Sequence, residues 1–338
     1  EAQDDHGHGT HVSGIAAATT DNDQGVVGLG WNAEILPIKV LSAKGGGSIS
    51  DLTSAIYYAT DKGANVINLS LATNPDYNLQ CSQFPALIEA LEYAYKHGAL
   101  TIVAAGNDND DASKVVPANC PYVLTVAATE GNDTRASFSN YGHVIDIAAP
   151  GVSIYSTLLG NRYGVKSGTS MAAPFVAGLA SLVWAKYPAY TPDQVSEALL
   201  NNAADLGETG WDNEYGCGRI DALNAVIRGA TSASSCRTNT LKPESDTMGM
   251  ATTQTAAMMA PVGAPEETYI AGHLIVRLQD NRAQDTLSSE YNIETLQTLA
   301  DGTLLVRVPK GAEWDTAQNL FEDGVIVYAQ ADYLVFAQ

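Results

Sequence analysis

The sequence is short of positive charge. It has 17 lysines and arginines against 38 aspartates and glutamates, which gives a net charge of −21. Nucleic acids and anionic membrane surfaces are bound through basic patches, so this shortage argues against both as main partners. The chain also lacks a run of about 18 apolar residues, the length that a membrane-spanning helix needs. We therefore expect a well-solvated acidic surface and no segment that spans a membrane.

Cysteine is also scarce, and no two cysteines have the C-x-x-C spacing of zinc ribbons and thioredoxin-like proteins. The four cysteines allow three pairings. We favour Cys81 with Cys120 and Cys217 with Cys236, which would indicate a secreted or extracytoplasmic protein. Buried free thiols are the alternative. No secretory signal pattern opens the chain, and its first residue is Glu1 rather than Met, so we expect it to be cut from a longer protein.

What the chain does have is apolar content: 45% of its 338 residues are hydrophobic and 16% are charged, which is enough for a sizeable core and two domains. Short apolar runs alternate with helical patterns such as PALIEALEYAYKHG across residues 1–229. The runs of strand length are AEILPIKVL, NVINLSLA, ALTIVAAGN, YVLTVAAT and VIDIAAPG. This alternation predicts a doubly wound α/β domain whose mostly parallel sheet is covered on both faces.

The composition changes after this domain. Residues 230–265 are rich in Ser, Thr, Ala, Met and Pro without periodicity, which indicates a linker. Residues 266–338 then form a second unit. Its predicted strands are HLIVRLQ, IETLQTL, TLLVRVP and VIVYAQ, and its predicted helices are NRAQDTLSSEYN and EWDTAQNLFEDG. The order β-α-β-β-α-β predicts a small α+β ferredoxin-like domain.

Two polar residues stand at points where such a fold places chemistry. Ser170 follows a glycine turn and opens a helical segment, where free backbone N–H groups favour a developing oxyanion. Asn107 ends an apolar strand, at the sheet edge where open α/β proteins bind ligands. Each residue alone could equally be an ordinary helix cap or turn residue.

Three histidines, His6, His8 and His11, open the chain in DDHGHGTHVSG. They could form a metal cluster, or one could be catalytic beside two bystanders. A zinc hydrolase of the H-x-H-x-D-H kind needs Asp where Thr10 stands and further ligands downstream, which have no recognisable counterparts here. Ligand number and spacing therefore argue against a catalytic metal.

Three motifs in order, HGTHV at 8–12, AAGN at 104–107 and GTSMAAP at 168–174, resemble the subtilisin-like serine proteases, the subtilase family. Most of residues 1–228 fits that pattern. The resemblance implies a serine endopeptidase that hydrolyses peptide or protein substrates. It assigns Ser170 as the nucleophile, His8 as the general base, and the Asn107 amide with the Ser170 backbone N–H as oxyanion donors.

The family's third catalytic group, an aspartate in a D-[ST]-G setting, should lie some tens of residues before the histidine. Only seven residues precede His8, and Asp4 and Asp5 are too close to serve. Loss of the acid costs about 10⁴ in turnover in the best-known triad. We expect this chain by itself to be weakly active or inactive. The alternative is a catalytically dead subtilase-fold protein that binds or inhibits.

The resemblance also implies how a substrate binds. Two extended edges would sandwich a peptide as an antiparallel strand: Gly45, Gly46 and Gly47 on one side, and Ser70, Leu71 and Ala72 on the other. Two pockets would be lined by Ala104, Ala105, Gly106 and Val115 for the first, and by Ile49 and Leu52 for a more distant apolar one. A preference for apolar side chains follows.

The resemblance also implies a bound structural ion, calcium. TTDNDQGV at 19–26 resembles the family's calcium loop, and oxygen ligands on a bent loop suit a hard cation. The implied ligands are the Asn22 side chain and the carbonyls of Thr19, Gln24 and Val26. A second, weaker site would use Asp146 with the carbonyls of Ala118, Cys120 and Val123. Solvated loops without an ion are the alternative.

The end of the chain resembles the subtilase propeptide, which acts as a folding chaperone and an inhibitor. GHLIVRL, LLVRVPKG and GVIVYAQADYLVF carry the likeness. Its position is unusual, because the family places this domain before the peptidase. A tandem protease cut after its second propeptide, a permuted or misassembled gene, and a retained regulatory copy all fit. In each case this domain is a candidate intramolecular inhibitor.

Overall fold

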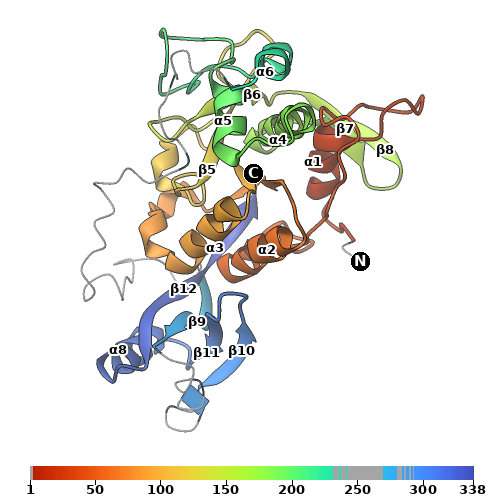
Figure 1. Ribbon diagram of the computed structural model, residues 1–338. Helices are drawn as coiled ribbons and strands as arrows, with labels where there is room; N and C mark the ends of the chain where they lie inside the picture. Colours follow the sequence, from red (N-terminus) through yellow and green to blue (C-terminus); the bar gives the residue numbers. More distant parts are fainter. Residues whose placement is uncertain are drawn as a thin grey trace.

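The computed structural model describes residues 3–230, 236, 241, 269–279, 284, 287–288, 291 and 293–338. Figure 1 shows an N-terminal part (residues 3–230) of helices around a sheet, and a smaller C-terminal part (residues 269–338). The predicted linker at 230–265 and the predicted helix at 281–292 lie almost wholly outside the described residues. Among the described helices, none is long and apolar enough to cross a membrane.

The N-terminal part is built on a parallel sheet of four strands in the order β2-β4-β5-β6. The strands are β2 (Val66–Leu69), β4 (Leu100–Ala104), β5 (Val123–Thr129) and β6 (Ile147–Pro150). Every residue of β4 and β5 is buried, as near-continuous apolar runs require in a sheet covered on both faces. The predicted parallel α/β sheet is confirmed.

Helices cover both faces of this sheet. On one face, α2 (Ile49–Asp61) and α3 (Pro85–Lys96) share an apolar cluster with Leu69 and Val103. On the other face, α4 (Thr169–Lys186) packs on Ile102 and Leu124. The remaining helices are α1 (His8–Ala17), α5 (Pro192–Leu200) and α6 (Ala222–Arg228), and β7 (Ile154–Leu158) pairs with β8 (Arg162–Lys166) in a hairpin against α1.

One predicted strand is wrong. The run AEILPIKVL at 33–41 pairs with no strand among the described residues, and Ile35 and Leu36 are 44% and 43% exposed. The run has the apolar composition of a buried strand. It lacks a neighbouring strand on which to pair.

The C-terminal part is a curled antiparallel sheet in the order β12-β9-β11-β10. Its elements are β9 (Tyr269–Leu278), β10 (Glu294–Thr298), β11 (Leu304–Arg307), α8 (Glu313–Glu322) and β12 (Ile326–Ala337). It has its own apolar core, in which Ala317 and Leu320 of α8 pack on the sheet. Strand β12 is longer than this sheet needs, and Figure 1 shows it running on to end within the N-terminal part.

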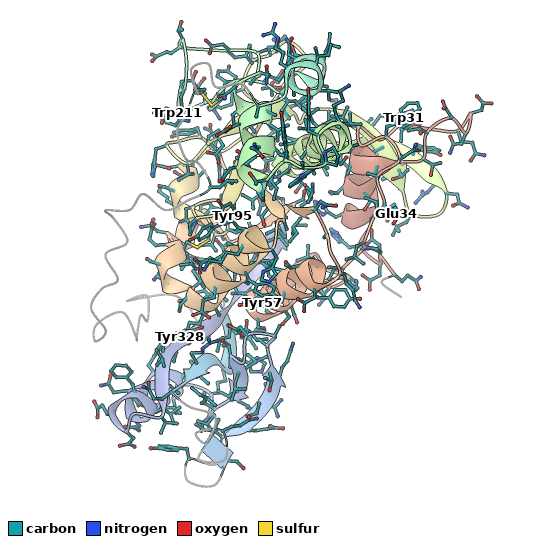
Figure 2. The ribbon with its side chains drawn as sticks, viewed as in Figure 1. Trp31, Glu34, Tyr57, Tyr95, Trp211 and Tyr328 are labelled. Atoms are coloured by element: carbon teal, nitrogen blue, oxygen red, sulfur yellow. A yellow bond between two sulfur atoms is a disulfide. The ribbon has the colours of Figure 1, made fainter. Side chains whose placement is uncertain are left out.

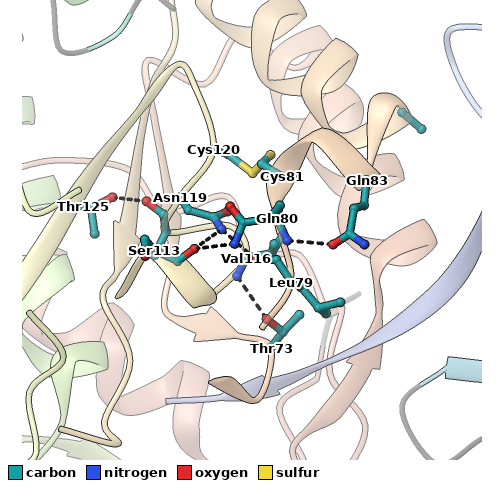
Figure 3. The surroundings of a disulfide bond; sticks show 12 residues. Thr73, Leu79, Gln80, Cys81, Gln83, Ser113, Val116, Asn119, Cys120 and Thr125 are labelled. Atoms are coloured by element: carbon teal, nitrogen blue, oxygen red, sulfur yellow. Dashed lines mark hydrogen bonds between the residues drawn. A yellow bond between two sulfur atoms is a disulfide. The ribbon is translucent and has the colours of Figure 1, made fainter. Parts of the chain in front are cut away.

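The two disulfides form as predicted, between Cys81 and Cys120 and between Cys217 and Cys236. The first joins two segments far apart in sequence, the loop before α3 and the loop before β5 (Figure 3). These bonds account for all four cysteines, so the alternative of free thiols is excluded.

Candidate active site

The two predicted substrate edges flank an antiparallel strand, and that strand is the chain's own end. The last residues of β12 pair with β1 (Gly46–Ser48) on one side and with β3 (Leu71–Ala72) on the other. Phe336 is opposite both Gly46 and Ala72, and the Ala337 N–H donates to the Gly45 carbonyl at 2.9 Å. An extended peptide thus fits between the edges with main-chain hydrogen bonds on both sides.

The side chains of this tail alternate between the protein and solvent. Val335 is fully buried and belongs to the same apolar cluster as Ile49, Leu52 and Val115, whereas Phe336 is 37% exposed. This alternation is the period-two pattern of a strand with one face on the protein. An aliphatic side chain of this tail and the residues predicted for the more distant pocket thus share one apolar cluster.

Ser170 lies at the first turn of α4, fully buried beneath the edge strand. Its hydroxyl donates to the Ser70 carbonyl at 3.1 Å, and the Ser70 hydroxyl donates back to the Ser170 carbonyl at 3.0 Å. This reciprocal pair fixes the start of α4 against one wall of the cleft. The predicted nucleophile and the predicted substrate edge are thereby in direct contact.

His8 opens α1, and its Nε2 atom lies 3.2 Å from the carbonyl oxygen of Gln338, the residue that follows β12. Because a carbonyl only accepts, Nε2 carries the proton in this contact. Burial lowers the pKa of His8 to about 4; the bond to Gln338 opposes the shift, and Lys166 and His6 add to it. Within the described residues, no Asp or Glu side chain is hydrogen-bonded to the ring, and the His8 and Ser170 side chains bond to main-chain oxygens rather than to each other.

Asn107 lies in the segment that follows β4, near the same carbonyl. Its side-chain oxygen accepts from the Thr169 N–H at 2.8 Å and from the Thr169 hydroxyl at 3.0 Å, so its amide N–H₂ group is turned away from that helix end. A Cβ atom added at Gly168 would lie 3.3 Å from both the Asn107 Nδ2 atom and the Gln338 carbonyl oxygen. The predicted oxyanion donor and the terminal carbonyl therefore share one small region.

Three of the residues predicted to line the first pocket stand at the end of β4 and directly after it. Ala104, Ala105 and Val115 are all fully buried. Gly106 has φ of 101°, and a Cβ there would lie 2.3 Å from the side chain of Asn140, so only glycine fits. Ala104, Ala105 and Val115 belong to three different apolar clusters, and the first pocket stays a prediction.

Known proteins match the part of the chain that contains these residues. The profile described as "Subtilase family" matches residues 1–218. The chain belongs to the subtilase family. Its sequence is 42% identical over 227 residues to a thermophilic serine proteinase of Bacillus sp. (strain AK1). The aligned region covers 67% of this chain and 53% of that protein. It is also 42% identical to subtilisin DY of Bacillus licheniformis, over 66% of this chain and 78% of that protein. The chain thus spans about half the length of the first relative.

Solved structures agree with this assignment. This subtilase superposes on a protease from Pseudoalteromonas arctica with a TM-score of 0.59 and 36% identity, covering 65% of this chain and 70% of that chain. A cold-adapted subtilisin-like serine proteinase gives a TM-score of 0.56 and 33% identity, covering 65% and 75%. The family match ends at residue 218, and the C-terminal part of this subtilase lies beyond it.

Three orienting residues were missed by sequence reasoning. Thr169 holds the Asn107 amide, and Asn140 donates to the Ala105 carbonyl while accepting from the Asp108 N–H. Asp4 accepts from Thr10 and from backbone N–H groups at the start of α1, and these bonds outweigh burial and lower the pKa of Asp4. Thr169 and Asp4 are close in sequence to the predicted catalytic residues, which was an available local signal, whereas Asn140 is distant in sequence from Ala105 and Asp108.

His11, the third histidine of the opening segment, is packed in the interior of this subtilase. His11 is fully buried and its Nε2–H donates to the Gly164 carbonyl at 3.2 Å. His6 is exposed, and its ring centroid lies 6.2 Å from that of His8.

The residues implied as calcium ligands occupy two different environments. The loop at 19–26 is largely exposed, and the Asn22 side-chain oxygen accepts from the Gln24 N–H at 3.1 Å. Asp146 is buried, and its carboxylate accepts from the Thr125 N–H while the Ala118 carbonyl accepts from the Thr125 hydroxyl. The part of the chain that the structure describes has no group of three or more His, Cys, Asp or Glu side chains placed to hold a metal.

Proposed function

We propose that this chain carries the nucleophile, base and substrate cleft of a secreted serine endopeptidase. One observation supports this most: an extended segment lies antiparallel between both predicted edges, with its last carbonyl beside His8, Asn107 and Gly168. A peptide bound in that position presents its scissile carbonyl to the predicted catalytic groups. Secretion is supported by the two disulfides.

The proposed chemistry follows from these positions. The Ser170 hydroxyl oxygen attacks the carbonyl carbon, and the His8 imidazole takes the hydroxyl proton and gives it to the leaving amine. The negative charge on the carbonyl oxygen is stabilised by the Asn107 amide and the Ser170 backbone N–H. Water then hydrolyses the acyl-enzyme by the same route, with His8 again accepting and returning one proton.

We further propose that the carboxylate partner of His8 comes from a strand outside this sequence. A groove of about 2120 Å³ runs between residues 35–41 and β2 and reaches His8. Strand β2 is the outer strand of the described parallel sheet, so its free edge is a template for another strand. An acid-bearing strand in this groove would give the unpaired run at 35–41 a neighbour and end beside His8. Without it we expect turnover reduced by about 10⁴.

We propose that residues 1–229 form the peptidase domain, 230–265 a linker and 266–338 a propeptide-like inhibitor domain. The strand order β12-β9-β11-β10 with α8 on one face agrees with a ferredoxin-like βαββαβ unit. Its tail occupies the cleft. Its Asp332 carboxylate accepts from the Ser50 N–H at the start of α2, and Gln330 accepts from the Ala86 N–H at the start of α3. These bonds satisfy N–H groups that helix starts leave unpaired.

We propose calcium as a structural ion. The implied ligands at 19–26, and those around Asp146, are all oxygen atoms, which fits a hard cation. Bound there, calcium would tie down the loop after α1. It takes no part in the peptide-bond chemistry.

The test is covalent labelling by a fluorophosphonate probe, followed by peptide mapping. We expect the label on Ser170 and none in Ser170→Ala, with faster labelling when the tail is shortened. Labelling of another residue, or equal labelling of Ser170→Ala, would contradict the assignment. A tail-shortened chain that is folded but never labelled, even with the acid-bearing strand supplied, would favour the dead binding protein.

A further inference from the structure

Strand β12 passes from the C-terminal part to the N-terminal part at Tyr333. Its last pair with β9 joins Tyr333 to Tyr269. Its first pair with β1 joins the next residue, Leu334, to Ser48. Tyr333 is 1% exposed and is the largest fully buried side chain among the described residues. It stands two positions before the buried Val335, so both side chains lie on the same face of the strand.

The Tyr333 ring has an aromatic neighbour from each part. Phe84, which precedes α3 in the N-terminal part, is fully buried, and its ring centroid lies 5.1 Å from that of Tyr333 with an interplanar angle of 79°. The centroid of Tyr269, at the start of β9, lies 6.1 Å away at an angle of 56°. Edge-to-face ring pairs are favourable beyond the apolar area that they bury. The ring therefore stabilises the contact between the two parts.

The Tyr333 hydroxyl opposes this stabilisation. Its oxygen is buried, and among the described residues it has no hydrogen-bond partner. Tyr328, which Figure 2 labels on the same strand, differs because its hydroxyl is hydrogen-bonded to the Thr303 hydroxyl at 3.4 Å. A phenol hydroxyl that loses its bonds to water on docking, without gaining others, costs free energy. Ring and hydroxyl thus act in opposite directions at one residue.

We propose that Tyr333 determines how tightly the C-terminal part is held: its ring anchors that part on Phe84, and its hydroxyl weakens the anchor. The site is therefore selective, and phenylalanine would be held more tightly than the tyrosine that occupies it. The consequence for inhibition rests on the proposed inhibitory role of the C-terminal part, whereas the anchoring does not. An inhibitor held less tightly than its site allows is displaced by substrate at a lower concentration.

Two backbone amides report separation of the two parts. The Ser50 N–H donates to the Asp332 carboxylate at 2.9 Å, and the Ala86 N–H donates to the Gln330 side-chain oxygen at 3.3 Å. Each donor belongs to the N-terminal part and each acceptor to β12. The exchange of these amides with solvent therefore follows the opening of the contact, while a substitution at Tyr333 leaves both pairs of groups in place.

The test is amide hydrogen exchange of the full chain, read at the Ser50 and Ala86 N–H groups. Tyr333→Phe removes the hydroxyl and keeps the ring, whereas Tyr333→Leu removes both. Tyr328→Phe is the matched control, because it removes a hydroxyl that has a partner from a buried tyrosine of the same strand.

We expect Tyr333→Phe to raise the protection of both amides about tenfold over the wild type. Tyr333→Leu should be protected about tenfold less than Tyr333→Phe, since both variants lack the hydroxyl and only one keeps the ring. Tyr328→Phe should gain no protection.

Unchanged or lower protection in Tyr333→Phe would overturn the proposal, because the hydroxyl would then not weaken the contact. An equal gain in Tyr328→Phe would also overturn it, since the loss of any buried hydroxyl of β12 would then have the same effect. Equal protection in Tyr333→Phe and Tyr333→Leu would show that the ring is not the anchor. Amide exchange does not depend on peptide hydrolysis, so the proposed function can fail separately.

Discussion

The Nε2 atom of His8 lies 3.2 Å from the carbonyl oxygen of Gln338, although 330 positions separate these residues. In the proposed mechanism, the carbonyl of the scissile peptide bond would lie at this position. The same tail fills both predicted substrate edges, so one feature links the cleft, the base and the C-terminal part.

The first prediction concerns the oxyanion donor. Asn107→Ala should lower kcat of the acid-complemented enzyme by about 10²–10³, the magnitude known for the equivalent donor in this family, with a small change in KM. Asn109→Ala removes a nearby side chain whose oxygen accepts from Arg135, and it should leave kcat unchanged. Steady-state kinetics on one peptide substrate compare the two. Equal effects of the two variants would remove Asn107 from the reaction.

The second prediction concerns the tail. Val335→Asp places a charge in a fully buried apolar pocket, whereas Phe336→Asp places it on a side chain that is 37% exposed. We expect Val335→Asp to make the cleft available to a fluorescent competing peptide at a roughly 100-fold lower concentration. Phe336→Asp should change this concentration little. Similar peptide affinities in both variants would show that the pocket does not hold the tail.

The third prediction concerns the segment after the edge strand. The Thr73 N–H donates to the Val116 carbonyl at 2.9 Å, and the Val116 N–H donates to the Thr73 hydroxyl at 3.0 Å (Figure 3). Thr73→Val leaves the buried Val116 N–H without its acceptor, which should lower the free energy of unfolding by about 1–3 kcal/mol. Thr73→Ser keeps the hydroxyl and should lose less. Urea unfolding measures both, and equal losses would show that the hydroxyl is unimportant.

The fourth prediction is the protonation of His8. With the tail in place its pKa is about 4, chiefly because of burial. The group is therefore neutral above that pH, as a base must be. In Val335→Asp, where the tail leaves, the pKa should move back towards the ordinary 6.5. NMR titration of the imidazole protons in both chains measures the shift. A pKa that stays near 4 in the variant would mean that the tail does not bury the ring.

Local patterns were enough to predict the parallel sheet, and the favoured cysteine pairing was confirmed. The apolar runs of β4 and β5 are buried strands as predicted, and the glycine-to-helix junction at Ser170 is a helix start. The prediction of a strand at AEILPIKVL was wrong for a physical reason. A strand needs a neighbour, and the composition of a run does not report whether its neighbour is present.

The contacts of Asn140 and Thr73 could not be predicted from the sequence. Asn140 and Thr73 are an ordinary loop asparagine and threonine until the fold brings them to Ala105 and Val116. The occupation of the cleft was also beyond local patterns, since propeptide likeness suggests an inhibitor without placing its end. Long-range pairing of β12 with β1 and β3 determines that position.

Peptide hydrolysis by the chain, with and without an upstream segment carrying a D-[ST]-G strand, tests the central claim most directly. We predict that kcat/KM rises by about 10⁴ when the segment is supplied and that Ser170→Ala abolishes the gain. An unchanged rate on adding the segment, or a gain that survives Ser170→Ala, would contradict a serine mechanism centred on His8 and Ser170.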